Sequence, residues 1–172
     1  MKNKALAVVI LGGLAFTGLA FTLMGGESGV PFPQGYRRWV HLHSTVIGPK
    51  NSSLSGKPCE KPCTGGIFHF YANEKAMDGF RTGRFPDGSI IADELLETVE
   101  VGTDSSREGT RRGVGVMVKD SKKYSETGGW GFGRYEGDGQ TDASNAEGKN
   151  TCFQCHVPKK DHDYVFTVYQ ER

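Results

Sequence analysis

The segment CFQCH at residues 152–156 contains the residues of this sequence whose types and spacing indicate the most specific chemistry. C-x-x-C-H is the attachment pattern of a c-type haem. Two thiols add across the vinyl groups of the porphyrin, and the imidazole that follows them reaches the iron. We therefore expect Cys152 and Cys155 to bind one haem c covalently and His156 to ligate its iron.

Two other interpretations of this cysteine pair remain. A structural zinc site needs four protein ligands, usually from two pairs, and Cys59 and Cys63 are the only other thiols of the chain. The motif would otherwise be a pair of core cysteines beside a surface histidine. The spacing favours the haem over both.

The remaining cysteines stand in the segment KPCEKPC. In an oxidising compartment, the first expectation for Cys59 and Cys63 is a local disulfide. A loop this short can also hold the two Cα atoms too far apart, and both residues would then stay thiols.

The start of the chain indicates export. Lys2 and Lys4 precede an uncharged run, residues 5–24, that is rich in Ala, Leu, Val, Ile and Phe. We predict that residues 1–26 are a signal peptide or an N-terminal anchor, because the run is also just long enough to span a bilayer. Cleavage is favoured because Gly and Thr dilute the run. Residues 27–172 are then expected in the periplasm, tethered to the inner membrane if the segment is not cleaved.

Size and charge limit what the rest of the chain does. Residues 27–172 suffice for one hydrophobic core but not comfortably for two, so we predict a single haem-binding domain. The whole chain has 21 Lys and Arg against 20 Asp and Glu, and removing Lys2 and Lys4 leaves the two signs close to balance. This balance argues against nucleic acid as a partner and favours small-molecule ligands.

Strand signals outnumber helical ones. In residues 38–46, RWVHLHSTV, strict alternation would place Trp39, His41, His43 and Thr45 on one face. Further strands are predicted at residues 66–71, 94–101, 113–118, 129–135 and 164–169.

Helices are predicted at residues 73–81, with Asn73 as the cap and Gly83 as the stop, and at residues 144–155. The predicted fold class is therefore α+β, mainly an antiparallel β-sheet with a few helices, in a single domain.

Several stretches of the chain together resemble one family. GYRRWVHLHSTVIGP, GGIFHFYANEKAMDGFRTGRFPDGSIIADELLE, VGVMVKDSKKYSETGGWGF, CFQCH and DHDYVFTVY are similar to the cytochrome P-460 family, which also contains the cytochromes c′-beta. The resemblance covers about residues 35–170. It implies a mostly antiparallel β fold with added helices, a homodimer, and a haem iron held by His156 alone, with the opposite side open.

The block FPDGSIIADELLE bears on the branch of the family. In the hydroxylamine-oxidising members, the resemblance implies a lysine here that is cross-linked to the porphyrin, and its position falls on Asp93. No lysine occurs between Lys75 and Lys119, so this block cannot supply the cross-link. The nitric-oxide-binding c′-beta branch is expected to carry a bulky aromatic cap at about this place. The chain is closer to c′-beta because the lysine is absent, although Asp93 matches neither pattern.

A second strong iron ligand would make the protein an electron carrier. Met77 and Met117 are more typical of core methionines than of ligands. For His41, His43 and His69, a place in the sheet outweighs a ligand role, and His162 is expected to orient a haem propionate or to cap a turn.

Three residues are candidates for the haem pocket beyond the motif. If Asp93 is buried, its raised pKa would suit a distal acid or base, whereas a solvated turn before the next strand is equally compatible with the sequence. Phe68 is either a pocket side chain or core packing. Arg134 either pairs with a haem propionate or lies free on the surface.

Two classes of function therefore stay open. The first is a periplasmic mono-haem cytochrome that binds nitric oxide for carriage, scavenging or detoxification. The second is a haem oxidoreductase acting on hydroxylamine, nitric oxide or peroxide, with Asp93 as the acid/base. A simple electron carrier with a redox partner protein comes third.

Overall fold

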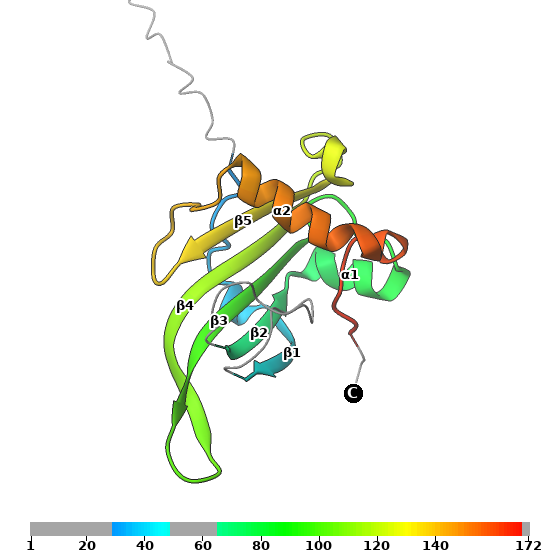
Figure 1. The fold of residues 1–172 in the computed structure, drawn as a ribbon. Helices are drawn as coiled ribbons and strands as arrows, with labels where there is room; N and C mark the ends of the chain where they lie inside the picture. The colour runs from blue at the N-terminus through cyan, green and yellow to red at the C-terminus, as the bar shows by residue number, and fades with distance from the viewer. Residues whose placement is uncertain (1–28, 49–64, 170–172) are drawn as a thin grey trace, which may run out of the picture.

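The computed structural model describes residues 29–48 and 65–169 (Figure 1). The predicted signal or anchor segment, residues 1–26, lies outside the described residues, and so do Cys59 and Cys63 with their predicted disulfide. No helix in the two described stretches is long and apolar enough to cross a membrane.

One antiparallel sheet of five strands forms the centre of the fold, and each strand pairs with its neighbour in the chain. The strands are β1 (Val40–Ile47), β2 (Gly66–Ala72), β3 (Ile90–Glu100), β4 (Ser106–Lys119) and β5 (Trp130–Glu136). The helix α1 (Glu74–Thr82) joins β2 to β3, and α2 (Ala146–His156) follows β5 and crosses one face of the sheet (Figure 1). Three short 3-10 helices, η1 (Tyr36–Arg38), η2 (Ser125–Thr127) and η3 (Val157–His162), complete the described elements. The predicted α+β single-domain fold is confirmed.

The two helices begin where their capping residues predict. The side chain of Asn73 accepts a hydrogen bond from the backbone N–H of Ala76 at 2.9 Å, and Gly83 ends α1 with a left-handed φ of 76°. Asn145 caps α2 by accepting from the N–H of Gly148 at 2.7 Å. Both predicted helices are confirmed to within a residue or two.

Two predicted strands are longer than expected. β3 begins at Ile90 rather than residue 94, and β4 begins at Ser106 rather than residue 113. The added part of β4 pairs with the end of β3 in a long hairpin that extends beyond the other strands (Figure 1). The added part of β3 pairs with the last residues of β4. Residues 106–108 at the start of β4 are all exposed, so they lack the alternation by which a half-buried strand is recognised.

The predicted strand at residues 164–169 is wrong. Asp163 and Tyr164 have positive φ values of 51° and 64°, which turn the chain before this segment. Val165–Tyr169 is then without ladder pairing. It packs against the helices instead, since Val165 is buried in the core and the Tyr169 ring lies 6.2 Å from that of Phe80 in α1.

A β-bulge changes the predicted faces of β1. His41 lies opposite Tyr71 and His43 lies opposite Phe70, which is the next residue of β2, so one extra residue, Leu42, is accommodated between them. The bulge puts His41 and His43 on opposite faces of the sheet. Strict alternation, which placed them together, therefore gave the wrong face for one of them.

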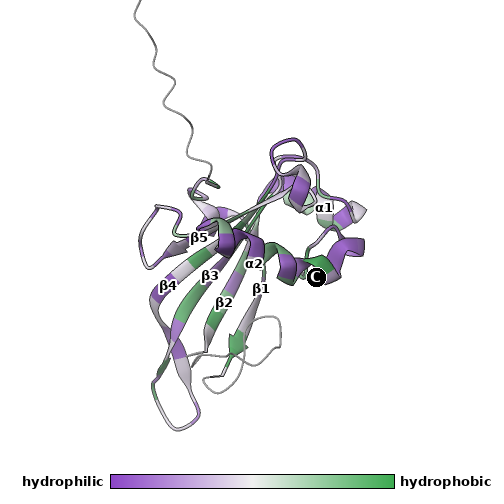
Figure 2. Cartoon of the chain, turned by 45° about the horizontal axis from the view of Figure 1, so that its top comes forward, coloured by the Kyte–Doolittle hydropathy of each residue, from purple (hydrophilic) through white to green (hydrophobic). Residues whose placement is uncertain are grey.

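Each face of the sheet has its own hydrophobic cluster. The face covered by α1 and α2, called here the helix face, packs the residues Ala72, Met77, Ile91, Trp130, Phe132 and Val165. The opposite face packs Ala92, Val114, Val116 and Tyr135 beneath the N-terminal residues Val30 and Tyr36. Figure 2 shows hydrophobic residues on the strands where the mostly hydrophilic α2 crosses the sheet. The sheet is thus the middle layer, and α2 is positioned above the helix face.

Candidate functional site

A cavity of about 470 Å³ lies between the helix face of the sheet, the helix α2 and the C-terminal segment 165–168. Its volume is in the range of cavities that hold small molecules and cofactors. The sheet contributes His43, Thr45, Phe70, Ile91, Asp93, Gly115, Val116, Met117, Phe132 and Gly133, and the other walls contribute Cys152, Cys155, His156, Val165, Phe166, Thr167 and Val168.

All three chemical residues of the C-x-x-C-H motif line this cavity. Cys152, Cys155 and His156 are spaced i, i+3 and i+4, so they share one side of α2. No residue of α2 is fully buried, because the inner side of this helix borders the cavity rather than a packed core. Neither Cys152 nor Cys155 is in a disulfide, and burial raises the pKa of Cys152.

The ring of His156 has a defined orientation. Its Nδ1 lies 2.7 Å from the carbonyl oxygen of Tyr164. A carbonyl can only accept, so Nδ1 carries the proton and Nε2 keeps its lone pair. Burial lowers the pKa of His156, although the bond to Tyr164 acts in the opposite direction. His156 is thus held as a neutral imidazole, which is the form that binds a metal.

Aromatic side chains flank His156. The ring centroids of Phe132 and Phe166 lie 5.2 Å and 5.0 Å from the imidazole. These side chains restrict the movement of the ring on both sides and make its surroundings apolar.

Five residues form one row across the whole sheet. The strand registers place His43 opposite Phe70, Phe70 opposite Asp93, Asp93 opposite Gly115, and Gly115 opposite Arg134. Directly opposed residues point to the same face, so the row crosses the helix face beneath the cavity.

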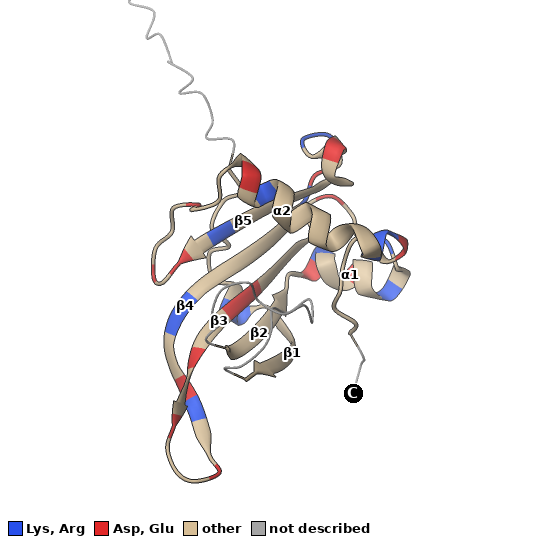
Figure 3. Cartoon of the chain, viewed as in Figure 1, with Lys and Arg blue, Asp and Glu red and all other residues tan. Residues whose placement is uncertain are grey.

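Asp93 stands inside β3 and lines the cavity, which excludes the alternative of a solvated turn. The next residue, Glu94, points to the other face, where it is buried and accepts hydrogen bonds from Tyr36 at 2.8 Å and from Arg37. Figure 3 shows an acidic segment in the middle of β3, with basic segments in β4 and β5. The pleat thus separates two adjacent carboxylates into two unlike environments.

The environment of Asp93 makes its carboxyl easier to protonate than an ordinary aspartate. Burial raises the pKa of this carboxyl from 3.8 to about 6, although the positive charge of Arg134 and a backbone hydrogen bond lower it. A carboxyl with this pKa exchanges protons close to neutral pH, as a general acid or base must.

Gly115 leaves the space that the Asp93 carboxyl occupies. A Cβ at this position would collide with Oδ1 of Asp93 and come within 2.9 Å of its Cγ. We predict that Gly115→Ala displaces the carboxyl and lowers the free energy of unfolding by about 1–3 kcal/mol, the usual cost of an overpacked site. Urea unfolding measures the change. Gly48→Ala is the matched control, since a Cβ there meets nothing within 4 Å. Equal stabilities of the two variants would contradict the prediction.

Arg134 and Phe68, two of the predicted cofactor-binding residues, are not among the residues that line the cavity. The Arg134 side chain is exposed, and it acts on the site through its charge on Asp93. The ring of Phe68 stacks 6.5 Å from that of Phe70, on the same side of β2. Alternation along β2 therefore identified the correct face, and Phe70 rather than Phe68 lines the cavity.

His43, which the sequence favoured as a sheet histidine over an iron ligand, lies at the site. It lines the cavity, its ring stacks on Phe70 with centroids 4.5 Å apart, and burial lowers its pKa. Its face of the sheet could not be predicted because of the bulge, since strict alternation grouped His43 with His41.

The other candidate iron ligands are distributed over the molecule. Met117 lines the cavity, whereas Met77 is buried in the core. His41 and His69 lie on the opposite face of the sheet, joined through Ser44 by contacts of 3.0 Å and 2.6 Å. His162 ends η3 and is not part of the cavity wall.

The donor set of the cavity fits a haem c. Within residues 29–48 and 65–169, no three His, Cys, Asp or Glu side chains are grouped as a bound metal ion alone would require. The cavity instead offers two thiols and one imidazole on a single helix, facing walls that are mainly apolar and aromatic. Thioether bonds and one axial nitrogen ligand need this combination.

The family model of Cytochrome P460 matches residues 33–167, which is most of the chain. No curated protein matches the sequence.

Proposed function

Because the chain belongs to the cytochrome P460 family, and is therefore a haem-binding cytochrome, we propose that it carries one covalent haem c and binds nitric oxide. In this proposal Cys152 and Cys155 hold the haem and His156 ligates its iron. A haem iron held by His156 alone would be open to nitric oxide or carbon monoxide.

The observation that carries the proposal is the placement of the motif around one cavity. Cys152, Cys155 and His156 face it from the same side of α2, and the Tyr164 carbonyl leaves Nε2 of His156 unprotonated. The chain thus offers one nitrogen ligand from α2, and the sheet forms the wall on the other side.

The sheet wall suits a small and largely apolar ligand. Phe70, Ile91 and Met117 supply apolar surface, and Asp93 and His43 are the titratable groups among them. A neutral Asp93 carboxyl can donate one hydrogen bond to a bound ligand. Since no lysine occurs between Lys75 and Lys119, the porphyrin cross-link implied for hydroxylamine oxidation has no source in this block, which favours nitric oxide binding.

A second candidate function is an oxidoreductase acting on hydroxylamine, nitric oxide or peroxide. The observation that favours it is the pKa of Asp93, which is raised to about 6 by burial. In this role Asp93 would accept a proton from a substrate or return one, and the charge of Arg134 would stabilise the ionised form between the two events.

The optical spectrum of the reduced protein tests the proposal. We predict a high-spin ferrous spectrum that changes when carbon monoxide or nitric oxide is added, because His156 is the only protein ligand in this proposal. A low-spin ferrous spectrum that is insensitive to carbon monoxide would contradict it and indicate an electron carrier.

In that event, Met117 is the side chain to test, because it lines the cavity. Met117→Leu would then open the iron to carbon monoxide. Met77→Leu is the matched control, since Met77 is buried in the core.

The proposal also places the protein in the periplasm and makes it a homodimer. Export is supported by the charged start and apolar run of residues 1–24, and the dimer by the resemblance to the family. Fractionation of expressing cells and light scattering of the purified protein test the two points. A cytoplasmic location or a monomeric mass would contradict them.

A further inference from the structure

The chain makes an unusual turn shortly after the C-x-x-C-H motif. Asp163 and Tyr164 have φ values of 51° and 64°, and within the described ranges no other residue except glycine has a positive φ. Aspartate adopts this left-handed conformation more readily than a bulky tyrosine does. The surrounding structure must therefore hold the turn in place.

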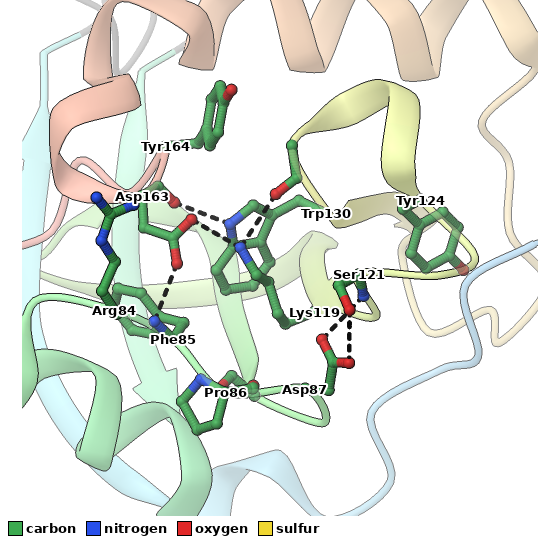
Figure 4. A network of polar contacts seen from close by, with 12 residues as sticks. Arg84, Phe85, Pro86, Asp87, Lys119, Ser121, Tyr124, Trp130, Asp163 and Tyr164 are labelled. Carbon is green, nitrogen blue, oxygen red and sulfur yellow. Dashed lines mark hydrogen bonds and ion pairs between the residues drawn. The ribbon is translucent and has the colours of Figure 1, made fainter.

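The side chain of Asp163 ties this turn to the sheet (Figure 4). Its Oδ1 accepts from the ammonium of Lys119 at 2.6 Å, and its Oδ2 accepts from the backbone N–H of Phe85 at 2.9 Å. Its backbone carbonyl accepts from the indole N–H of Trp130 at 2.8 Å. The turn is thus bonded to the ends of β4 and β5 and to the loop after α1.

Lys119 is equally constrained. Its ammonium also donates to the carbonyl of Gly128 at 3.0 Å and lies 5.0 Å from the ring centroid of Trp130. The side chains of Lys119 and Asp163 are only 10% and 7% exposed. Burying two charges is costly, and a buried pair is by itself weak evidence for stability. A role in positioning is a more specific explanation for its presence here.

Tyr164 carries the effect of the turn to His156. Its N–H donates to the carbonyl of Lys159 at 2.8 Å, and Gly128 leaves room for its ring, because a Cβ on Gly128 would collide with that ring. Val165, on the other side of this peptide, is buried, and its N–H donates to the carbonyl of His162 at 3.1 Å. The Tyr164 carbonyl is thereby directed at Nδ1 of His156, 2.7 Å away.

We propose that the buried pair of Lys119 and Asp163 is a positioning pair for His156. It holds the Tyr164 carbonyl as the acceptor of the Nδ1 proton, and this hydrogen bond raises the basicity of the opposite nitrogen, Nε2. The inference rests on the proposed haem function, in which Nε2 is the iron ligand, and it concerns how strongly that nitrogen donates.

Lys119→Met in the haem-loaded chain is the deciding variant, because two explanations predict opposite signs. Removing a positive charge lowers the reduction potential if the charge acts only through space. If the pair positions Tyr164, its loss weakens the hydrogen bond to His156 and makes Nε2 a poorer donor, so the potential rises. We expect a rise of about 59 mV, equivalent to a tenfold change in the one-electron equilibrium constant.

The stretching frequency of the iron–histidine bond provides a second measurement that net charge hardly affects. We expect it to fall in Lys119→Met and in Asp163→Asn, since asparagine tolerates the left-handed turn but cannot pair with a buried ammonium. The double variant Lys119→Met/Asp163→Asn leaves no charge unpaired, so it keeps the comparison possible if a single variant fails to fold. We expect the low frequency there too.

Lys160→Met is the matched control, because Lys160 is an exposed lysine of the neighbouring η3. It should leave the iron–histidine frequency unchanged. A lowered potential in Lys119→Met, or an unchanged frequency in the variants of the pair, would overturn the inference while leaving the proposed function intact. A native chain without haem would instead overturn the proposed function, and this inference with it.

Discussion

The double variant Cys152→Ser/Cys155→Ser is expected to lose all of its haem on a denaturing gel, whereas the native chain retains its haem. The two thiols line one cavity on the same side of α2, so both are placed to form thioether bonds. Serine has a similar size and cannot form these bonds under the same conditions. Haem staining of the gel and the intact mass measure the result, and each single variant should keep one bond.

The variant Cys59→Ser/Cys63→Ser is the control, since it removes the other two cysteines of the chain. It should retain the haem on the gel and keep the full added mass of one haem. Retention of covalent haem by Cys152→Ser/Cys155→Ser, or its loss in the control, would contradict the assigned attachment.

The unfolding free energy of Asp93→Asn, measured relative to that of the native chain, is expected to be roughly 3 kcal/mol higher at neutral pH than at acid pH. The folded chain holds the Asp93 proton up to its pKa of about 6, whereas the ordinary value is 3.8. Each unit between the two values corresponds to about 1.4 kcal/mol. Between these values the folded state binds more protons than the unfolded state, so stability falls as the pH rises through this window. Asparagine resembles the neutral carboxyl and avoids the fall.

Urea unfolding of the native chain and of Asp93→Asn, from below pH 4 to pH 7, gives the difference between their unfolding free energies. The difference should widen between pH 4 and 6 and stay constant above. Asp104→Asn is the control, because Asp104 is exposed in the turn between β3 and β4. A difference that does not change with pH would mean that the carboxyl of Asp93 is ordinarily solvated.

The same variant separates the two candidate functions. If Asp93 donates to bound nitric oxide, Asp93→Asn should abolish any pH dependence of the N–O stretching frequency near pH 6. If it also abolishes a measurable turnover of hydroxylamine or peroxide, Asp93 is a catalytic acid/base and the protein is an enzyme.

The helices and the centres of five strands were predictable because their signals are local. Asn73 and Gly83 bound α1 through their own capping preferences, and β2 is a short run of aromatic and β-branched residues, which favours a strand. The outer part of β4, residues 106–112, is fixed by its pairing with β3 and carries no such pattern. Residues 164–169 have a strand-like pattern but do not pair with another strand. The sequence did not predict the turn that precedes them, because its positive φ values lie at Asp163 and Tyr164 rather than at a glycine.

The part of the site that the C-x-x-C-H motif forms was predictable, because haem attachment requires a fixed spacing of these residues. The motif predicted three residues that the structure brings to one cavity. Asp93 was singled out by the resemblance to the family, which implies a lysine at this place in some members. His43 and Phe70 required the strand registers, which depend on partners far along the chain. Lys119 and Asp163 lie 44 positions apart in the chain, and no local pattern around either residue predicts that they form a pair.

The bulge in β1 affects how the chain should be compared with relatives. Because His41 and His43 face consecutive residues of β2, deleting Leu42 would leave a regular ladder in which both histidines keep their present faces. Two homologous strands that differ by this one residue would therefore offer the same side chains to the cavity. An alignment should open its gap at Leu42. Placed elsewhere in the strand, the gap would equate a cavity residue of one protein with a residue on the far side of the sheet in the other.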